Sequence, residues 1–262
     1  MSQKIESDSS TPLQIQPILL YQEVGDKIGK VEYVQHMGND STVVNSARVS
    51  FGAHKEHLDS KDYKLIKYLV KNQHTSTLEH NVITFRITAP LFVRSQHMRH
   101  RTWSYNEISR RYTSLDIQFY EPLAFRTQHK SNRQASNPNQ LIDPEIAVSQ
   151  NFYFYSKQTK THGEQTSVKV SSASDAIKNH HKKSLTLYES LIQAGVSREQ
   201  ARGVLPQNLY SQYYATVNLN NLIKFIKLRL HEGAQWEIQQ LAKAFIAIAS
   251  EIWPNIFPLS LK

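Results

Sequence analysis

The chain has 262 residues, enough for one large domain or two small ones, and it carries a net charge of +9 with a pI of about 9.5. That charge favours anionic partners, namely nucleic acid, acidic membranes, or small molecules that bear phosphates and carboxylates. The absence of cysteine excludes disulfides, thiolate metal sites and a cysteine nucleophile in this chain, and because no apolar run resembles a membrane span or the core of a signal peptide, we expect a soluble cytoplasmic protein.

The N-terminal half predicts strands that alternate with helices. Residues 1–12 are rich in serine and charge and predict a disordered tail, which leaves residues 13–262 as a single domain. Residues 59–71 place apolar side chains at helical spacing, with Asp59 or Ser60 as the cap. Pro90 stands in the first turn of a second helix, which continues to residue 99. Strands are predicted at residues 13–24, 30–37, 81–89, 108–112 and 117–120.

The C-terminal half predicts helices that follow a polar excursion. Residues 128–175 are dense in Ser, Asn, Gln, Lys and Thr and predict a long surface excursion or a partly ordered insertion, whose aromatic island at 152–155 docks on another surface. Helices are predicted at residues 176–194, 198–205, 218–230 and 234–253. The apolar stripes of the last two are core or a helix–helix interface with another subunit. The fold class is therefore α+β, with helices dominating the second half.

The most informative stretch is residues 99–112, RHRTWSYNEISRRY. Four arginines stand against the single acid Glu107, so the stretch has a formal charge of +3 with His100 neutral. Like charges this close repel unless an anion bridges them or solvent screens them, and arginine forks match phosphate and carboxylate oxygens bidentately. The stretch is thus either a solvated basic face or a binding site for an anion. The interleaved hydroxyl and amide side chains favour the binding site, because a solvated face does not need them.

Other nucleotide and metal motifs are missing from the sequence. The segment GDKIGK at residues 25–30 lacks the spacing and the final Ser or Thr of a P-loop, and no GxGxxG supports a Rossmann site. His74 and His80 flank TSTLE without HExxH spacing, so we expect no metal site. His180 and His181 are adjacent beside two lysines, which indicates a solvated helix edge.

The stretch 99–112 resembles the signature of the flavin-dependent thymidylate synthases, which is RHR, seven residues and then Ser, within the fuller pattern RHRxxSxNExSxRY. Further segments resemble that family in the same order: ARVS at 47–50, HTSTLEH at 74–80, RGVLPQNLY at 202–210, and residues 218–240 with AQWEIQQ at their end. The resemblance covers residues 50–252 outside the excursion. It implies the family's α+β fold, with an antiparallel or mixed sheet, long helices and a helical C-terminal half.

The resemblance also implies an activity. Members of the family make dTMP from dUMP by reductive methylation, in which methylenetetrahydrofolate supplies the carbon, FAD carries the hydride and NADPH reduces the flavin. A chain without cysteine suits this route, because the other thymidylate synthases attack the uracil ring with a cysteine. Members assemble as homotetramers with shared active sites, so we expect the same here, with dUMP, folate and NADPH as partners and neither membrane nor nucleic acid. The rival hypothesis is a basic nucleic-acid-binding protein.

The site residues implied by the resemblance are those at positions that match the family pattern. Arg229 resembles the arginine that binds the uracil and favours ionisation at N3, because a guanidinium stays protonated at any working pH. Ser109 has no adjacent His and acid to deprotonate it, so we interpret it as a ligand rather than a nucleophile. Substrate ligands are predicted at Gln96, Arg99, Glu107, Ser109, Arg111, Arg202 and Arg229, of which Arg229 is the catalytic residue. Flavin contacts are predicted at Ser50, His74, Ser76, Arg99, His100, Arg101, Glu107, Asn218 and Lys224.

Simpler structural roles remain open for several of these side chains. Glu107 could be a local countercharge for Arg110 or Arg111. Arg202 could be a helix-surface arginine, and His74 a capping or core histidine. Arg110 sits where the family pattern is free, so we predict that it faces solvent.

Two positions depart from the family pattern on the helix predicted at residues 218–230. Asn220 stands where many members carry Arg, and Lys224 stands where members often carry Asn or His at a flavin contact. Lys224 can still reach a phosphate or a ring oxygen.

Overall fold

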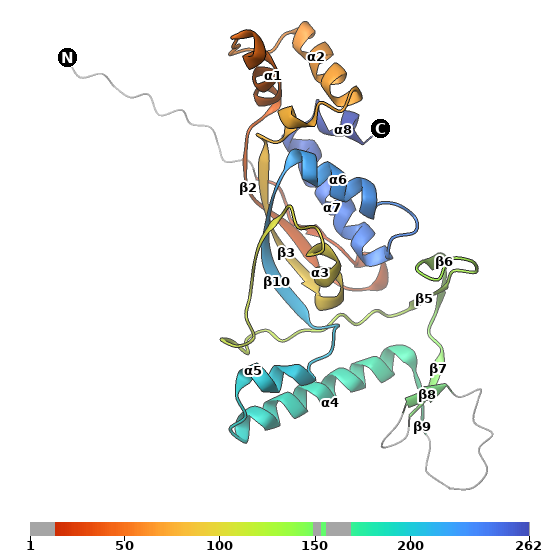
Figure 1. Ribbon diagram of the computed structural model, residues 1–262. Coiled ribbons are helices and arrows are strands. Elements are labelled where there is room, and N and C mark those ends of the chain that lie inside the picture. Colours follow the sequence, from red (N-terminus) through yellow and green to blue (C-terminus); the bar gives the residue numbers. More distant parts are fainter. Residues whose placement is uncertain (1–13, 149–152, 156–168, 262) are drawn as a thin grey trace.

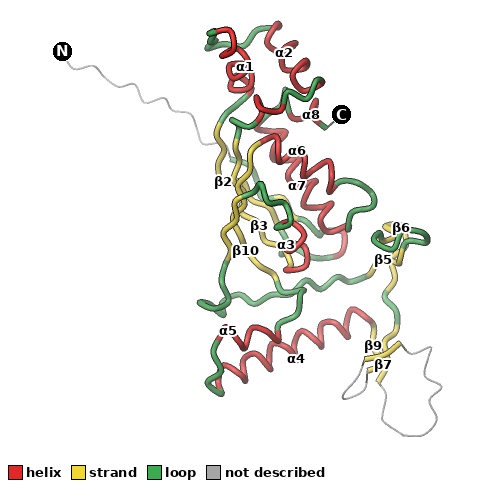
Figure 2. The backbone as a smooth tube through the Cα atoms, viewed as in Figure 1, coloured by secondary structure: helices red, strands yellow, loops and turns green. Residues whose placement is uncertain are grey.

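The computed structural model describes residues 14–148, 153–155 and 169–261, and its centre is an antiparallel sheet covered by helices (Figure 1). The strand order is β1-β2-β3-β10-β4, and every neighbouring pair is antiparallel. Figure 2 shows β2, β3 and β10 side by side. The strands are β1 (Ile18–Leu19), β2 (Lys30–Met37), β3 (Val82–Pro90), β4 (Ser104–Glu107) and β10 (Tyr210–Asn218). The predictions of β2 and β3 are confirmed. The strand predicted at 108–112 is wrong, because the chain turns there after β4, and β10 is not among the predicted strands.

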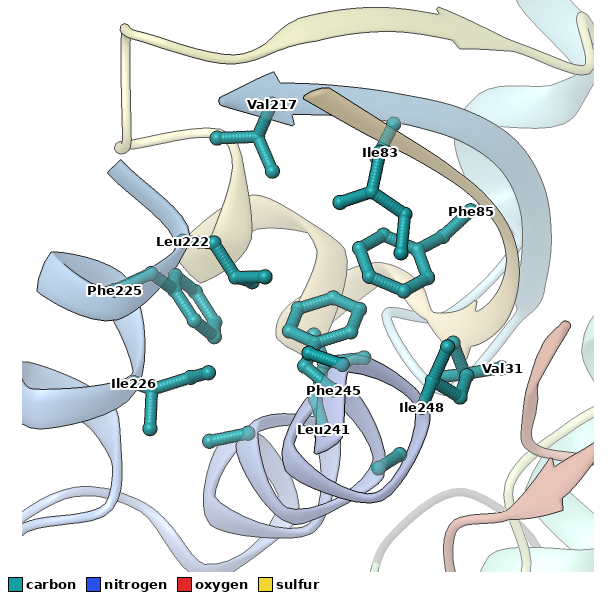
Figure 3. Close-up of a cluster of buried hydrophobic side chains, with 14 of the residues drawn as sticks. Val31, Ile83, Phe85, Val217, Leu222, Phe225, Ile226, Leu241, Phe245 and Ile248 are labelled. Carbon is teal, nitrogen blue, oxygen red and sulfur yellow. The ribbon is translucent and has the colours of Figure 1, made fainter. Parts of the chain in front are cut away.

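Two helices after β10 build the core against the sheet. They are α6 (Leu219–Arg229) and α7 (Trp236–Ile252). Between the sheet and α7, the ring centroids of Phe85 and Phe245 lie 4.4 Å apart (Figure 3). The surrounding apolar cluster includes Val31, Ile83, Val217, Leu222, Phe225, Ile226, Leu241 and Ile248. The apolar stripes predicted at 218–230 and 234–253 are therefore core.

Two helices run toward each other over the same face of the sheet. β3 passes directly into α3 (Leu91–His97), and β10 passes directly into α6. Because Tyr210 lies opposite Pro90 and Asn218 lies opposite Val82 in the antiparallel pair, α3 and α6 begin at opposite ends of it. Both helices pack on α7. Their C-terminal ends therefore approach each other, and the basic stretch at residues 99–112 begins at this place.

A further group of helices lies at one end of the sheet (Figure 1). It contains α1 (Asp40–Arg48), α2 (Ser60–Lys71) and α8 (Phe257–Ser260), with the 3-10 turns η2 (Val49–Phe51) and η3 (Thr75–Leu78). The prediction of α2 and its cap is confirmed, because the Asp59 carboxylate accepts from the N–H groups of Lys61 and Asp62. A third 3-10 turn, η1 (Gln22–Val24), follows β1.

The excursion and the residues just before it contain strands that the sequence did not predict. β5 pairs with β6, and β7 lies between β8 and β9. These strands are β5 (Phe125–Gln128), β6 (Ser136–Ile142), β7 (Glu145–Val148), β8 (Tyr153–Tyr155) and β9 (Lys169–Ser172). The predicted tail at 1–12 and Phe152 of the aromatic island lie outside the described residues.

A helical pair connects the excursion to β10. It consists of α4 (Ala173–Gln193), α5 (Arg198–Ala201) and the 3-10 turn η5 (Arg202–Val204). A second apolar cluster, made by Tyr188, Ala201, Leu205 and Leu209, holds the pair together. No helix in the part of the chain that the structure describes is both long and apolar enough to cross a bilayer.

Candidate functional site

Glu107 ends β4 and is held by two neighbours. Its carboxylate accepts hydrogen bonds from the guanidinium of Arg94 on α3 and from the hydroxyl of Ser211 on β10. Each partner occupies a different carboxylate oxygen, and the Glu107 side chain is only 17% exposed. The alternative role of Glu107 as a countercharge for Arg110 or Arg111 is wrong, because its charged partner is Arg94. The Arg94–Glu107 ion pair instead ties α3 to the sheet.

Arg229 and His100 form a pair where α3 and α6 converge. Nε of Arg229 donates to Nε2 of His100 over 3.0 Å, and the His100 ring meets the edge of Phe225 with 4.6 Å between centroids. Burial, and after it the charge of Arg229, lower the pKa of His100 to about 4. The imidazole is therefore neutral at pH 7, and its Nε2 is free to accept. Because Nε of Arg229 is already used, the two Nη groups form the edge of the guanidinium that is available to a ligand.

The turn that carries His100 rests on a buried aromatic group. The Tyr105 hydroxyl donates to the carbonyl oxygens of His97 over 2.8 Å and of His100 over 3.2 Å. His97 is fully buried, with Nδ1 3.0 Å from the Tyr213 hydroxyl. Burial holds the pKa of His97 well below its usual range, and the nearby His100 and Arg229 add to the effect. The start of the RHR motif is thus fixed from the core side by neutral groups.

A second group of predicted ligands gathers around Glu199 on α5. Nη2 of Arg111 lies 3.6 Å from the Glu199 carboxylate, and Nε of Arg202 donates to the Glu199 carbonyl oxygen over 3.3 Å. Ser109 lies beside them, because its hydroxyl accepts from the N–H of Arg111 over 3.3 Å. The side chains of Arg111 and Glu199 are 53% and 58% exposed, so their ion pair contributes little stability. Both arginines therefore remain available to an anion.

A third group lines a cavity of about 680 Å³ among α2, α6 and α8. We call it the lysine cavity, because its walls carry Lys67, Lys71, Lys224 and Lys227 and no carboxylate. The predicted flavin contacts His74 and Lys224 both line it, beside the apolar side chains of Leu69, Val70, Leu78, Ile223 and Leu259. Asn220 is buried in its wall and donates to Oε1 of Glu79 over 2.9 Å. Such walls suit a ligand that has both anionic and apolar parts.

The other predicted flavin contacts lie outside that cavity. Ser50 and Ser76 are exposed in the 3-10 turns η2 and η3. Asn218 caps α6, because its side-chain oxygen accepts from a backbone N–H of the first helical turn over 2.9 Å. Arg99 and Arg101 are exposed, and among the described residues no carboxylate forms an ion pair with either.

Comparison with known proteins identifies the family. The family model described as Thymidylate synthase complementing protein matches residues 32–255. A flavin-dependent thymidylate synthase of Thermus thermophilus is 40% identical over 226 residues, which are 86% of this chain and 73% of the relative. This chain belongs to the flavin-dependent thymidylate synthase family. A second relative of that name, from Thermotoga neapolitana, is 38% identical over 234 residues, covering 89% of this chain and 91% of the relative.

A solved structure agrees with this assignment. The UMP/dUMP methylase PolB from Streptomyces cacaoi, bound with 5-Br dUMP, matches with a TM-score of 0.68 and 29% identity over 87% of this chain and 93% of that one. The α+β fold and the enzyme class expected from residues 99–112 are thereby confirmed. The chain is therefore a flavin-dependent thymidylate synthase by family.

Two side chains of this thymidylate synthase contradict the predictions. Arg110 is 9% exposed rather than solvated, because its guanidinium donates to the carbonyl oxygens of Leu115 and Asp116. Burial lowers the pKa of Arg110, and the two carbonyls replace the water that it loses. His181 is 3% exposed rather than on a solvated helix edge, and its Nδ1 lies 2.8 Å from Oε1 of Glu121.

The sequence did not reveal the partners that hold the predicted ligands in this thymidylate synthase. Arg94 and Ser211 carry no motif of their own. Gln96 is bonded through its Nε2 to Oε1 of Gln235, which belongs to the AQWEIQQ segment that matched the family without a role. Within the described ranges no group of three or more His, Asp or Glu side chains is arranged to hold a metal ion.

Proposed function

We propose that this chain catalyses the reductive methylation of dUMP to dTMP, with methylenetetrahydrofolate as carbon donor, NADPH as reductant and FAD as the bound flavin. The observation that carries the proposal is the Arg229–His100 pair at the converging ends of α3 and α6. The names of the relatives and the brominated dUMP bound to the similar methylase support the substrate class.

Arg229 supplies the chemistry that a thiolate would otherwise provide. The edge left free by His100 offers two N–H donors side by side, which suits a uracil ring whose N3 has lost its proton to water, because the adjacent oxygen and nitrogen then both accept. Negative charge on the ring after loss of the N3 proton is stabilised by a cation that stays protonated. The ring then becomes electron-rich enough to accept a carbon, and this chain has no cysteine to activate it in another way.

The lysine cavity fits FAD by the chemistry of its walls. FAD combines a dianionic diphosphate with two flat ring systems, and the cavity combines four lysines with apolar side chains. Lys224 and Lys227 on α6, together with Lys67 and Lys71 on α2, would hold the diphosphate. His74, at the entrance to η3, would contact the rings. A flavin held there would supply the hydride-transfer chemistry between NADPH and the nucleotide.

A homotetramer with shared sites is supported by the way one chain distributes its predicted ligands. One group lies at Arg229, a second around Glu199 and a third in the lysine cavity. Figure 1 shows α5 and α2 at opposite ends of the molecule. A neighbouring copy would have to bring its Arg111 and Arg202 to the Arg229 of this chain to complete a nucleotide site.

The test of the proposed function begins with colour. The purified protein is expected to be yellow, and dUMP should perturb the visible absorbance of the flavin. NADPH should then bleach the oxidised flavin. A colourless protein that takes up no added FAD, yet binds oligonucleotides with a steep salt dependence, would refute the proposal and support the nucleic-acid-binding rival.

A further inference from the structure

A line of side-chain hydrogen bonds runs from α3 into the core, and we call it the Gln96 relay. Nε2 of Gln96 donates to Oε1 of Gln235 at the start of α7. Nε2 of Gln235 donates to Oε2 of Glu237 over 2.9 Å. Oε1 of Glu237 pairs with the guanidinium of Arg126. The relay thus connects a predicted substrate ligand to the carboxylate of Glu237 in the first turn of α7, whose side chain is 6% exposed.

The inner end of the relay is firmly anchored. The Arg126 guanidinium lies 4.4 Å from the centroid of the Trp236 ring, and its Nε donates to Oγ of Ser136 over 3.1 Å. The Tyr120 hydroxyl donates to the same Glu237 oxygen as Arg126, over 3.3 Å. All three partners of the Glu237 carboxylate, namely Arg126, Tyr120 and Gln235, donate to it in these contacts. Glu237 therefore acts as the acceptor at the inner end of the relay.

This acceptor fixes the orientation of both amides in turn. A side-chain amide has one acceptor oxygen and one donor nitrogen, so it can bond in either of two flipped arrangements. Gln235 must direct its N–H to Glu237, which leaves its oxygen facing Gln96. Gln96 must in consequence donate with its nitrogen. The second N–H of the Gln96 amide remains as a donor, three residues before Arg99.

We propose that Gln235 and Glu237 are positioning residues, which hold the Gln96 amide in one orientation so that its remaining N–H meets an oxygen of the nucleotide phosphate. This inference rests on the proposed function, in which Gln96 is a substrate ligand. Without the relay the amide could turn over, and its oxygen would then face the phosphate and repel it. The relay would thus assign a function to the AQWEIQQ segment, because two of its side chains, Gln235 and Glu237, act through Gln96.

A double-mutant cycle on dUMP binding tests this assignment. Gln235→Leu keeps the size of the side chain but removes both relay bonds, and it should raise the Kd and the KM for dUMP about five- to tenfold while kcat stays within about twofold. Gln96→Ala should raise the Kd by a similar factor. Because Gln235 acts through Gln96, the double variant should bind dUMP no more weakly than Gln96→Ala, within about twofold. Two independent losses that multiply would overturn the proposal.

The controls separate positioning from a loss of structure. Gln239→Leu removes an amide one turn further along α7, where it bonds only the carbonyl of Ala234 over 2.8 Å, and it should leave dUMP binding unchanged. If Gln235→Leu does not fold, Gln235→Asn keeps an amide at the helix start that is too short to reach both partners. If the wild-type protein binds flavin and dUMP but the effects of the two substitutions are additive, only the positioning role of the relay is refuted. Wild-type protein that binds neither overturns the proposed function as well.

Discussion

Replacing Arg229 with alanine tests the centre of the proposed site. Nε of Arg229 is occupied by His100 at 3.0 Å, so its two Nη groups remain for the uracil edge. A hydrogen bond to a charged group contributes about 1.5–3 kcal/mol, and the partial exposure of Arg229 places each bond near the lower value. The loss of both should weaken dUMP binding by about 3 kcal/mol, on the order of 150-fold in Kd.

The assay is a dUMP titration followed by flavin absorbance, with the flavin-to-protein ratio measured in parallel. Flavin content should be retained, because Arg229 does not line the lysine cavity. Arg229→Lys keeps the charge but not the planar fork, so its loss should be only about tenfold. As a control, Lys243→Ala removes one exposed positive charge from a different helix, α7, and should leave the Kd for dUMP unchanged. A Kd for Arg229→Ala within about twofold of wild type would refute the reasoning.

Four further predictions address the remaining parts of the site. Ser109→Ala should raise the Kd of dUMP about fivefold and keep measurable turnover; complete loss of turnover with normal binding would identify a nucleophile. Lys224→Ala should weaken the binding of FAD more than that of FMN in fluorescence titrations. Equal losses of affinity would show that the diphosphate does not bind in the lysine cavity. Arg202→Ala and Arg229→Ala chains, each impaired alone, should regain activity when reassembled together, whereas no recovery would contradict shared sites. The pKa of His100 is lowered from 6.5 to about 4, so the unfolded chain binds more protons between those pH values. The free energy of unfolding should therefore fall by about 1–2 kcal/mol from pH 6.5 to 4, after allowance for partial exposure, and chemical denaturation of His100→Gln should lack this slope; identical pH profiles would count against it.

The elements that the sequence predicts best are those that local signals define. Helix α2 follows from its Asp59 cap and its apolar spacing, and both are present in the structure. Strand β10 was missed although it lies in the middle of the sheet. Its buried side chains alternate from Ser211 to Val217, but Ser, Gln and Tyr outnumber its aliphatic side chains, so the alternation does not read as apolar. A strand paired on both sides depends on partners distant in the sequence.

The predicted site likewise consists of residues that a local motif identifies and of contacts that only the fold creates. The RHR signature identifies its residues locally, whereas the bond between Arg229 and His100 joins positions 129 residues apart. Arg110 was placed in solvent because it sits where the family pattern is free, and an arginine without an assigned role is usually exposed. The turn after β4 instead offers it two carbonyl oxygens, which only the folded backbone brings together.

The basic stretch at residues 99–112 keeps its positive charge because its only acid, Glu107, forms an ion pair outside the stretch. Glu107 is paired with Arg94, which lies outside the stretch, so the arginines of the stretch are not neutralised by it. Burial, followed by the nearby charge of Arg99, lowers the pKa of Arg229, so the two cations repel each other. A dianionic nucleotide bound beside them would relieve that repulsion. The same arrangement would let an acid lie within the proposed nucleotide site, because Arg94 already compensates the charge of Glu107 and a phosphate would meet a positive surface.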